Sequence, residues 1–216
     1  MLNYCELAAS FCDKFNSFYK GDIDDYTAGD ETYIKIKGKF SYTFLFISAV
    51  NHKITSYHVS HTRDVFGAVP SILEAIRTSK PDQVITIISD GNPAYQEAVH
   101  FINRKFDKSL SLKKVIGLQN LDEESETYRP FKQLIERLNR TYKFHIRPAY
   151  GFNSKNGAIA LTILFVTHYN FLRDHIALDY QTPIQLDFLK ELDTIQAQWA
   201  EILNRSFNLE LTLQAA

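Results

Sequence analysis

The sequence predicts a mixed α/β protein in which a five-stranded sheet is flanked by helices. Two observations predict it: three strand-like runs follow one another early in the chain, and helical and strand-like runs alternate after them. Consecutive strands without helices between them pair as an antiparallel meander, whereas strands separated by helices become parallel neighbours. The two halves of the pattern together give one mixed sheet.

The first half of the chain predicts one helix and the meander. Residues 2–20 are amphipathic, with apolar residues at spacings of three and four that predict a helix. The acidic, turn-rich stretch GDIDDYTAGD connects this helix to ETYIKIKG, whose strict alternation is typical of a strand. The runs FSYTFLFISAV and KITSYHVS continue the meander, with a tight hairpin expected at Asn51 and His52.

The second half alternates helices with strands. Residues 63–77 have helical spacing and contain Pro70, so this helix is expected to start late or to kink. The continuous β-branched run QVITIIS is typical of a strand buried on both faces, and it ends just before Asp90. Asn92 and Pro93 then supply the cap and the first residue of the next helix. The remaining elements are a strand at LKKVIGLQN and helices over residues 126–143, 156–174 and 186–204.

The composition, 45% apolar and 23% charged over 216 residues, is typical of a soluble globular protein with a sizeable core. Cys5 and Cys12 are not spaced for a zinc site, so we expect free thiols in a reducing cytoplasm. The longest apolar run, residues 158–166, is too short to span a bilayer. We therefore expect a cytoplasmic protein with no membrane partner.

The charge distribution points to a phosphate-binding surface more than the net charge does. A net charge of −1 taken alone argues against a nucleic-acid binder. Between Arg129 and Lys155, however, seven Lys and Arg residues accompany a single acid, Glu136. Such a basic stripe is weak evidence by itself. The single acid within the stripe, Glu136, strengthens the prediction of a phosphate-binding surface.

Two carboxylates are expected at the middle of the sheet. Asp90 ends a buried strand, and ligand sites gather beyond the carboxyl ends of parallel strands. The alternative, that Asp90 only caps the next helix, is weaker because Asn92 suits that role better. Asp30 opens the first strand, which the element order places centrally beside the strand of Asp90; the alternative is a loop carboxylate. Alternation puts Glu31 on the opposite face, which we expect to be solvated or lightly covered.

Helical geometry tests the third carboxylate, Glu136. One stripe of the helix over 126–143 is apolar and is expected to dock: Phe131, Leu134, Ile135, Leu138 and Tyr142. A neighbouring face presents polar residues: Lys132, Glu136, Asn139, Arg140 and Lys143. The alternative for Glu136 is an ordinary surface ion pair with the arginine four residues on, which contributes well under about 1 kcal/mol.

Together, Asp30, Asp90 and Glu136 predict a divalent-metal site. Mg²⁺ prefers carboxylates and water, and substrate phosphate completes its coordination. Two such ions roughly 4 Å apart activate the attacking oxygen and stabilise the leaving oxygen of a displacement at phosphorus. The trio therefore predicts phosphoryl transfer on nucleic acid. The residues expected to contact DNA are Lys132, Asn139, Arg140, Lys143 and Arg147.

The predicted element order is the ribonuclease H-like arrangement. At these residues the chain resembles the DDE transposases of bacterial insertion sequences, within the retroviral-integrase superfamily. The resemblance runs from about residue 29 to 183, and four motifs carry it: D-E-T at the first strand, S-D-G-N-x-A-Y around Asp90, E-R-x-N-R-x-x-K from Glu136 to Lys143, and H-Y-N-F-L-R. It implies a ribonuclease H-like, metal-dependent polynucleotidyl transferase.

The resemblance also implies the metal ions of this core and its reaction on DNA. It binds two Mg²⁺ or Mn²⁺ ions through Asp30, Asp90 and Glu136, with Lys143 as the basic partner of the glutamate. It cleaves the ends of an insertion element and joins them to target DNA, working as a homo-oligomer on DNA at the nucleoid of a prokaryotic cell.

Three parts of the chain are expected: an N-terminal helix and linker (1–28), the ribonuclease H-like DDE core (29–183) and a C-terminal helix (184–216). Family members usually carry a helix-turn-helix or zinc-binding segment before the core, which residues 1–28 do not match. A catalytic-domain fragment, a truncated relic and one product of a split reading frame all remain open. So do two other functions: an inactive relic that binds DNA or self-associates, and a nuclease of the same fold.

Overall fold

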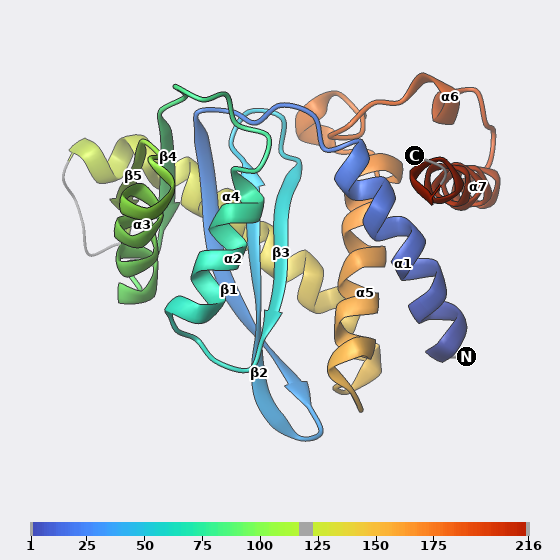
Figure 1. Ribbon diagram of the computed structural model, residues 1–216, viewed down its shortest axis with the longest axis horizontal. Helices are drawn as coiled ribbons and strands as arrows, with labels where there is room; N and C mark the ends of the chain where they lie inside the picture. Colours follow the sequence, from blue (N-terminus) through green and yellow to red (C-terminus); the bar gives the residue numbers. More distant parts are fainter. Residues whose placement is uncertain (1, 117–122, 215–216) are drawn as a thin grey trace. The chain divides into compact units, whose positions relative to one another are not determined.

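The computed structural model describes residues 2–116 and 123–214, and its elements follow the predicted order (Figure 1). The chain forms two compact units, residues 22–153 and residues 1–21 with 154–216. These units are defined by packing, and the expected division into three parts at residues 28 and 183 stays a prediction.

The unit of residues 22–153 holds a five-stranded sheet in the order β3-β2-β1-β4-β5. Its elements are β1 (Tyr26–Ile36), β2 (Lys39–Ser48), β3 (Ile54–Ser60), α2 (Val65–Ala75), β4 (Ile85–Ser89), α3 (Pro93–Phe106), β5 (Leu110–Lys114), α4 (Glu123–Ile146) and η1 (Arg147–Ala149). The first three strands pair antiparallel, whereas β4 is parallel to both β1 and β5. This confirms the predicted mixed sheet and the central place of the first strand.

Local capping explains where the helices on this sheet begin. The Asp64 side chain accepts a hydrogen bond from the Phe66 amide at the start of α2, and Pro70 lies inside that helix. The Asn92 side chain accepts from the Ala94 amide at the start of α3, with Pro93 as its first residue. Both caps satisfy backbone donors that have no partner within the helix. The predicted cap at Asn92 is therefore confirmed.

Two strands differ from their predicted bounds. β1 begins at Tyr26, inside the stretch predicted as a linker, because Tyr26 and its next two residues pair with β4. β5 ends at Lys114, earlier than the predicted run, of which residues 117–120 lie outside the described residues.

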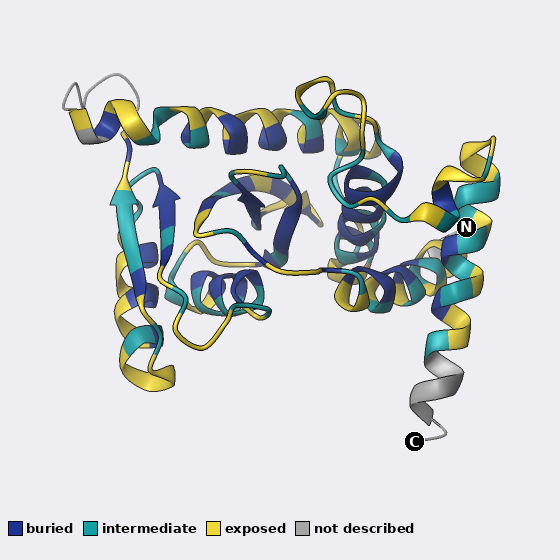
Figure 2. Ribbon diagram, turned by 90° about the horizontal axis from the view of Figure 1, so that it is seen from above, coloured by how far each residue is buried: buried dark blue, intermediate teal, exposed yellow. Residues whose placement is uncertain are grey.

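Helices cover both faces of the sheet, with α2 and α3 on one side and α4 on the other. Phe44 and Phe46 of β2 pack edge-on against Tyr95 of α3, with ring centroids 6.3 and 6.0 Å apart. On the other face, the Thr43 hydroxyl lies 3.2 Å from the Tyr142 hydroxyl of α4. In Figure 2 the buried residues of α4, the long helix that follows the grey trace, face the strands.

This packing corrects the expectation for the face that carries Glu31. Glu31 pairs with Phe44 across the sheet, and its side chain is 1% exposed beneath α2 and α3. The expectation of a solvated face was therefore wrong at Glu31. It holds further along the strand, where Tyr33 and Lys35 are exposed.

The α4 helix docks through the predicted stripe. Leu134, Ile135, Leu138 and Tyr142 are buried, and Phe131 is partly buried. The polar face next to it is divided, because Lys132 and Asn139 are buried whereas Glu136, Arg140 and Lys143 are exposed.

The second unit is helical and consists of α1 (Leu2–Phe18), α5 (Lys155–Thr167), the π-helical η2 (His168–Leu172), η3 (Ile176–Leu178), α6 (Asp187–Lys190) and α7 (Ile195–Gln214). Within it α1 packs against α5 and α7. Cys5 is exposed, Cys12 is buried, and both are free. The helix predicted over 186–204 is instead the short α6 followed by α7. None of the described helices is long and apolar enough to cross a membrane.

The close approach of β1 to β2 gives a test of the sheet. A methyl group at Gly29 would overlap the ring of Phe46, its partner across the sheet. We expect Gly29→Ala to lower the free energy of unfolding by about 1–3 kcal/mol because the ring must move, as measured by urea denaturation. Phe46→Leu should recover part of that loss in the double variant. Strictly additive losses would contradict the overlap.

Candidate functional site

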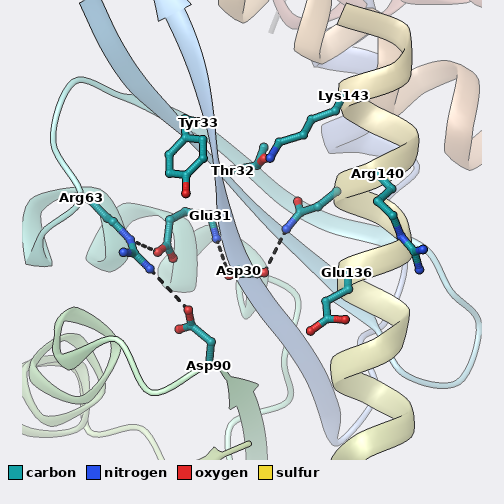
Figure 3. Close-up of a pocket in the computed structure, with 10 residues that line it drawn as sticks. Asp30, Glu31, Thr32, Tyr33, Arg63, Asp90, Glu136, Arg140 and Lys143 are labelled. Carbon is teal, nitrogen blue, oxygen red and sulfur yellow. Dashed lines mark hydrogen bonds and ion pairs between the residues drawn. The ribbon is translucent and has the colours of Figure 1, made fainter. Parts of the chain in front are cut away.

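A cleft of about 520 Å³ opens where the carboxyl end of β4 meets β1 and α4 (Figure 3). It is lined by Asp30, Glu31, Thr32, Tyr33, Arg63, Asp90, Glu136, Asn139, Arg140 and Lys143. The last register pair of the parallel strands is Ala28 with Ile88, and an aspartate lies two residues further on in each case, Asp30 within β1 and Asp90 just after β4. Parallel pairing therefore brings Asp30 and Asp90 to the same height along the strand direction.

Three carboxylates form a cluster at this point. Asp30, Glu31 and Asp90 each place an oxygen within 4.8 Å of the others. Neighbouring residues of a strand point to opposite faces, so Asp30 and Glu31 approach Asp90 from the two sides of the sheet. Glu136 is not in this close group. In Figure 3 it extends from α4 towards the space between the two aspartates.

Two residues of α4 hold the Asp30 carboxylate. Its Oδ2 atom accepts a hydrogen bond from the side-chain amide group of Asn139 at 3.0 Å and lies 3.3 Å from the Lys132 ammonium. Its Oδ1 atom accepts from the Glu31 amide at 3.0 Å. Because Lys132 and Asn139 lie one turn to either side of Glu136 on the helix, these contacts also place Glu136 opposite Asp30.

Burial raises the pKa of the Asp30 carboxyl to about 6. The positive charge of Lys132 opposes this rise, and the negative charges of Asp90 and Glu31 add to it. The cluster therefore concentrates negative charge in a partly buried place, where the ionised form of Asp30 is costly unless a cation is near.

Glu31 belongs to a second network, on the other face of the sheet. Its carboxylate accepts from the Tyr95 hydroxyl at 2.7 Å, from the Asn92 amide group at 3.2 Å and from Arg63 Nε. Arg63 also lies 3.4 Å from Asp90 Oδ2. Burial and the neighbouring Glu31 charge raise the pKa of Tyr95 well above its ordinary value, so its hydroxyl keeps its proton. Arg63 thus bridges Glu31 and Asp90.

This network around Glu31 was not predicted from the sequence. Glu31 and Tyr95 lie in motifs already noted, since Glu31 follows Asp30 in D-E-T and Tyr95 ends S-D-G-N-x-A-Y, whereas Arg63 lies outside them and precedes the cap Asp64. An arginine in the short segment between β3 and α2, in a chain with a carboxylate trio, was the available signal.

Two polar atoms of the cleft lack partners among the described residues. The Thr32 hydroxyl and the Asn139 side-chain oxygen are buried and accept or donate no hydrogen bond there. A buried acceptor without a partner costs free energy unless water or a ligand satisfies it. Carboxylate and amide oxygens are hard donors of the kind that Mg²⁺ and Mn²⁺ prefer. The residues present therefore fit a divalent cation.

The structure brings the predicted site residues into one cleft and its margin. Asp30 and Asp90 lie in the carboxylate cluster, and Glu136 lies on the opposite wall. Of the residues expected to contact DNA, Arg140 and Lys143 are exposed in the cleft, Arg147 lines an adjoining groove, and Lys132 and Asn139 contact Asp30. Their roles in metal and DNA binding stay predictions.

The sheet, its strand order and its flanking helices form a ribonuclease H-like fold similar to that of integrase catalytic cores. A chain of the simian T-cell lymphotropic virus intasome, solved with PP2A regulatory subunit B56 gamma, is 19% identical at a TM-score of 0.55, over 76% of this chain and 54% of that one. The catalytic core domain of HTLV-2 integrase, solved with magnesium in a trimeric form, is 17% identical at a TM-score of 0.51, over 74% of this chain and 94% of that one. These likenesses establish the fold.

Residues 27–149 match the DDE domain of IS240-type transposases, and the chain belongs to that family. It is therefore a member of the DDE transposase and integrase superfamily, as the sequence motifs predicted. The chain spans about half the length of the intasome chain that it matches. A search of curated proteins found no match.

The raised pKa of Asp30 predicts how stability depends on pH without divalent ions. The folded protein holds this proton up to about pH 6, whereas the unfolded carboxyl releases it near its ordinary pKa of 3.8. The stabilisation that Asp30 contributes is therefore complete below about pH 4, and it is lost as pH rises to about 6. Over this range the free energy of unfolding falls by up to about 3 kcal/mol. Urea denaturation from pH 4 to 7 measures this fall, which should shrink in Asp30→Asn but not in Asp82→Asn.

The same carboxyl can be followed directly by carbon-13 NMR. Because the Lys132 charge lowers the pKa of Asp30, Lys132→Met should move the titration midpoint above about 6. A midpoint near 4 in the unaltered protein would contradict the effect of burial.

Proposed function

We propose that the chain is a transposase catalytic domain that cleaves DNA and joins element ends to target DNA with the help of divalent metal ions. The observation that carries this proposal is the meeting of Asp30 and Asp90 at the parallel strands β1 and β4, with Glu136 across the cleft, in a member of the DDE family. Residues 29–183 would form this domain.

Asp30, Asp90 and Glu136 would hold two Mg²⁺ or Mn²⁺ ions. Bound there, the ions would supply Lewis acidity and an activated oxygen nucleophile for the displacement at phosphorus. The unpartnered Asn139 oxygen and the orientation of Asp30 by Lys132 support this assignment. Ligands must be held in place by neighbours if they are to bind metal well.

Two cations of the chain balance the carboxylates. Lys132 contacts Asp30, and Arg63 bridges Glu31 and Asp90. Glu31 is buried and its oxygens already accept three hydrogen bonds, so its part is to hold Arg63 rather than to bind substrate. Arg63 in turn would keep Asp90 directed towards the cleft.

DNA would follow the exposed basic side of α4. Arg140 and Lys143 line the cleft, and the Lys143 ammonium lies 5.0 Å from the centre of the Tyr33 ring. Lysine and arginine contacts to phosphate give affinity without sequence information. The HTLV-2 core was solved in a trimeric form, and we propose that this chain also works as a homo-oligomer.

Loss of one carboxylate tests the metal assignment. We expect Asp90→Asn to reduce joining of a 3′-hydroxyl oligonucleotide to a plasmid in Mn²⁺ by more than about 100-fold, beyond the range seen for groups that only support a ligand. Mn²⁺ binding, followed by electron paramagnetic resonance, should weaken in parallel. Asp82→Asn alters an exposed carboxylate outside the cleft and should leave both measurements unchanged.

The products decide between the related functions. Cleaved DNA without joined product would indicate a hydrolytic nuclease of the same fold. Absence of both products from the unaltered chain would indicate an inactive relic. Joining that survives Asp90→Asn would contradict the metal assignment.

Loss of a basic side chain tests the DNA path. Arg140→Gln and Lys143→Gln should each weaken binding to duplex DNA regardless of its sequence and lower the slope of affinity against salt by about 1. Lys105→Gln is the matched control, because Lys105 is exposed on α3, across the sheet from α4. An equal effect of Lys105→Gln, seen by fluorescence anisotropy, would contradict this path.

A further inference from the structure

A second groove, of about 280 Å³, adjoins the carboxylate cleft and shares Tyr33 with it. It lies between the outer end of β1, the start of β2 and the segment after α4. Its lining is Tyr33, Ile34, Lys35, Phe40, Ile146, Arg147, Tyr150, Gly151 and Phe152. This volume is below the range of about 300–1,000 Å³ typical of sites for whole small-molecule ligands. It suits a single planar group better.

Large aromatic rings are exposed around this groove. Tyr33 is 58% exposed, Phe40 is 64% exposed and Tyr150 is 95% exposed. The Tyr33 and Phe40 rings meet edge-on with centroids 6.0 Å apart. Because the Tyr150 side chain lines the groove and is almost fully exposed, its ring is accessible to a ligand there. These rings offer flat apolar faces against which a planar group can pack.

The backbone holds Tyr150 in an uncommon conformation. Tyr150 has a φ of 50° and Gly151 a φ of 113°, both in the left-handed range. Two hydrogen bonds fix the segment to β1, from the Phe152 amide to the Lys35 carbonyl and from the Lys37 amide to the Phe152 carbonyl, each 2.7 Å long. Non-glycine residues rarely adopt such a φ, and they do so where the surroundings impose it, often at functional sites. The ring is thus carried by a segment that is hydrogen-bonded to the end of β1 two residues further on.

The charge of the groove selects its occupant. Lys35 and Arg147 are the charged residues of its lining, and no acidic residue appears in that lining among the described residues. The Lys143 ammonium lies over Tyr33, where the groove meets the cleft. Exposed rings interleaved with basic side chains are the pattern of single-stranded nucleic-acid sites, in which rings stack on bases and cations contact the backbone.

We propose that this groove binds an unpaired nucleotide of the DNA whose backbone lies in the carboxylate cleft, with the base stacked on Tyr150. The inference rests on the proposed function, because the same DNA must occupy the cleft. A duplex end that has opened by a few base pairs would place its free base in the groove while its phosphates follow Arg147 and Lys143. The groove would then distinguish opened ends from fully paired DNA.

The test compares the affinity of the protein for two DNA duplexes of one sequence without divalent ions, one fully paired and one with three unpaired nucleotides at an end. We expect the unaltered chain to prefer the opened duplex by roughly 10-fold, within the range for stacking of one base. Tyr150→Ala should abolish this preference and leave the affinity for paired DNA unchanged. Tyr150→Phe should retain it.

Two variants separate the ring from other effects. Tyr150→Asn removes the ring but tolerates the left-handed backbone, so it should behave as Tyr150→Ala does. Phe66→Ala removes a ring that is 81% exposed on α2 and should leave the preference intact. An unchanged preference in both Tyr150→Ala and Tyr150→Asn would overturn the proposal while the function in DNA binding stands.

Other outcomes are equally decisive. If the protein binds neither duplex, the proposed function fails and this inference fails with it. If Tyr150→Ala changes the sedimentation of the protein but not its DNA preference, the groove is a contact between copies of the chain and the proposal is wrong.

Discussion

The parallel pairing of β1 with β4 is the constraint on which the site depends. It places Asp30 and Asp90 at one level, although sixty positions separate them in the chain. The contact of Asp30 with Lys132 and Asn139 then determines which side of α4 faces the cleft. Because these two residues lie on either side of Glu136, one interaction positions both walls of the site. Strand pairing and helix docking are thus coupled through a single carboxylate.

Electrostatics explains why the neighbours of the carboxylates are cations and hydrogen-bond donors. Three acidic side chains in a partly buried place repel one another. Burial raises the pKa of the Asp30 carboxyl, and the negative charges of Asp90 and Glu31 add to that rise. Lys132 on one face of the sheet and Arg63 on the other reduce that repulsion. The Tyr95 hydroxyl, which keeps its proton, satisfies Glu31 within the core. The fold itself therefore provides the interactions that keep the three carboxylates together in the cleft.

Much of the fold could be predicted because its signals are local. The apolar stripe of α4, the Asn92 cap with Pro93 and the β-branched run of β4 each depend on a few neighbouring residues. The sheet order followed from the order of the elements. The predictions were wrong where the packing of one element against another determines the structure. Glu31 was assigned to a solvated face because alternation shows that Glu31 and Asp30 lie on opposite faces but not which helices cover each face. The predicted single helix over 186–204 is interrupted between α6 and α7 for the same kind of reason, since spacing alone does not show where a helix ends.

The sequence by itself determined the element order and the family and led to the prediction of the carboxylate trio, because strand and helix periodicities and short motifs are properties of neighbouring residues. Only the tertiary structure decided how those carboxylates are held. Lys132 could be read as a DNA contact from its helical face, yet it is buried against Asp30. Arg63 and Tyr95 had no assigned part, yet they complete the network around Glu31. Such contacts join residues far apart in the chain, and they depend on the distance between packed faces, which no local pattern contains.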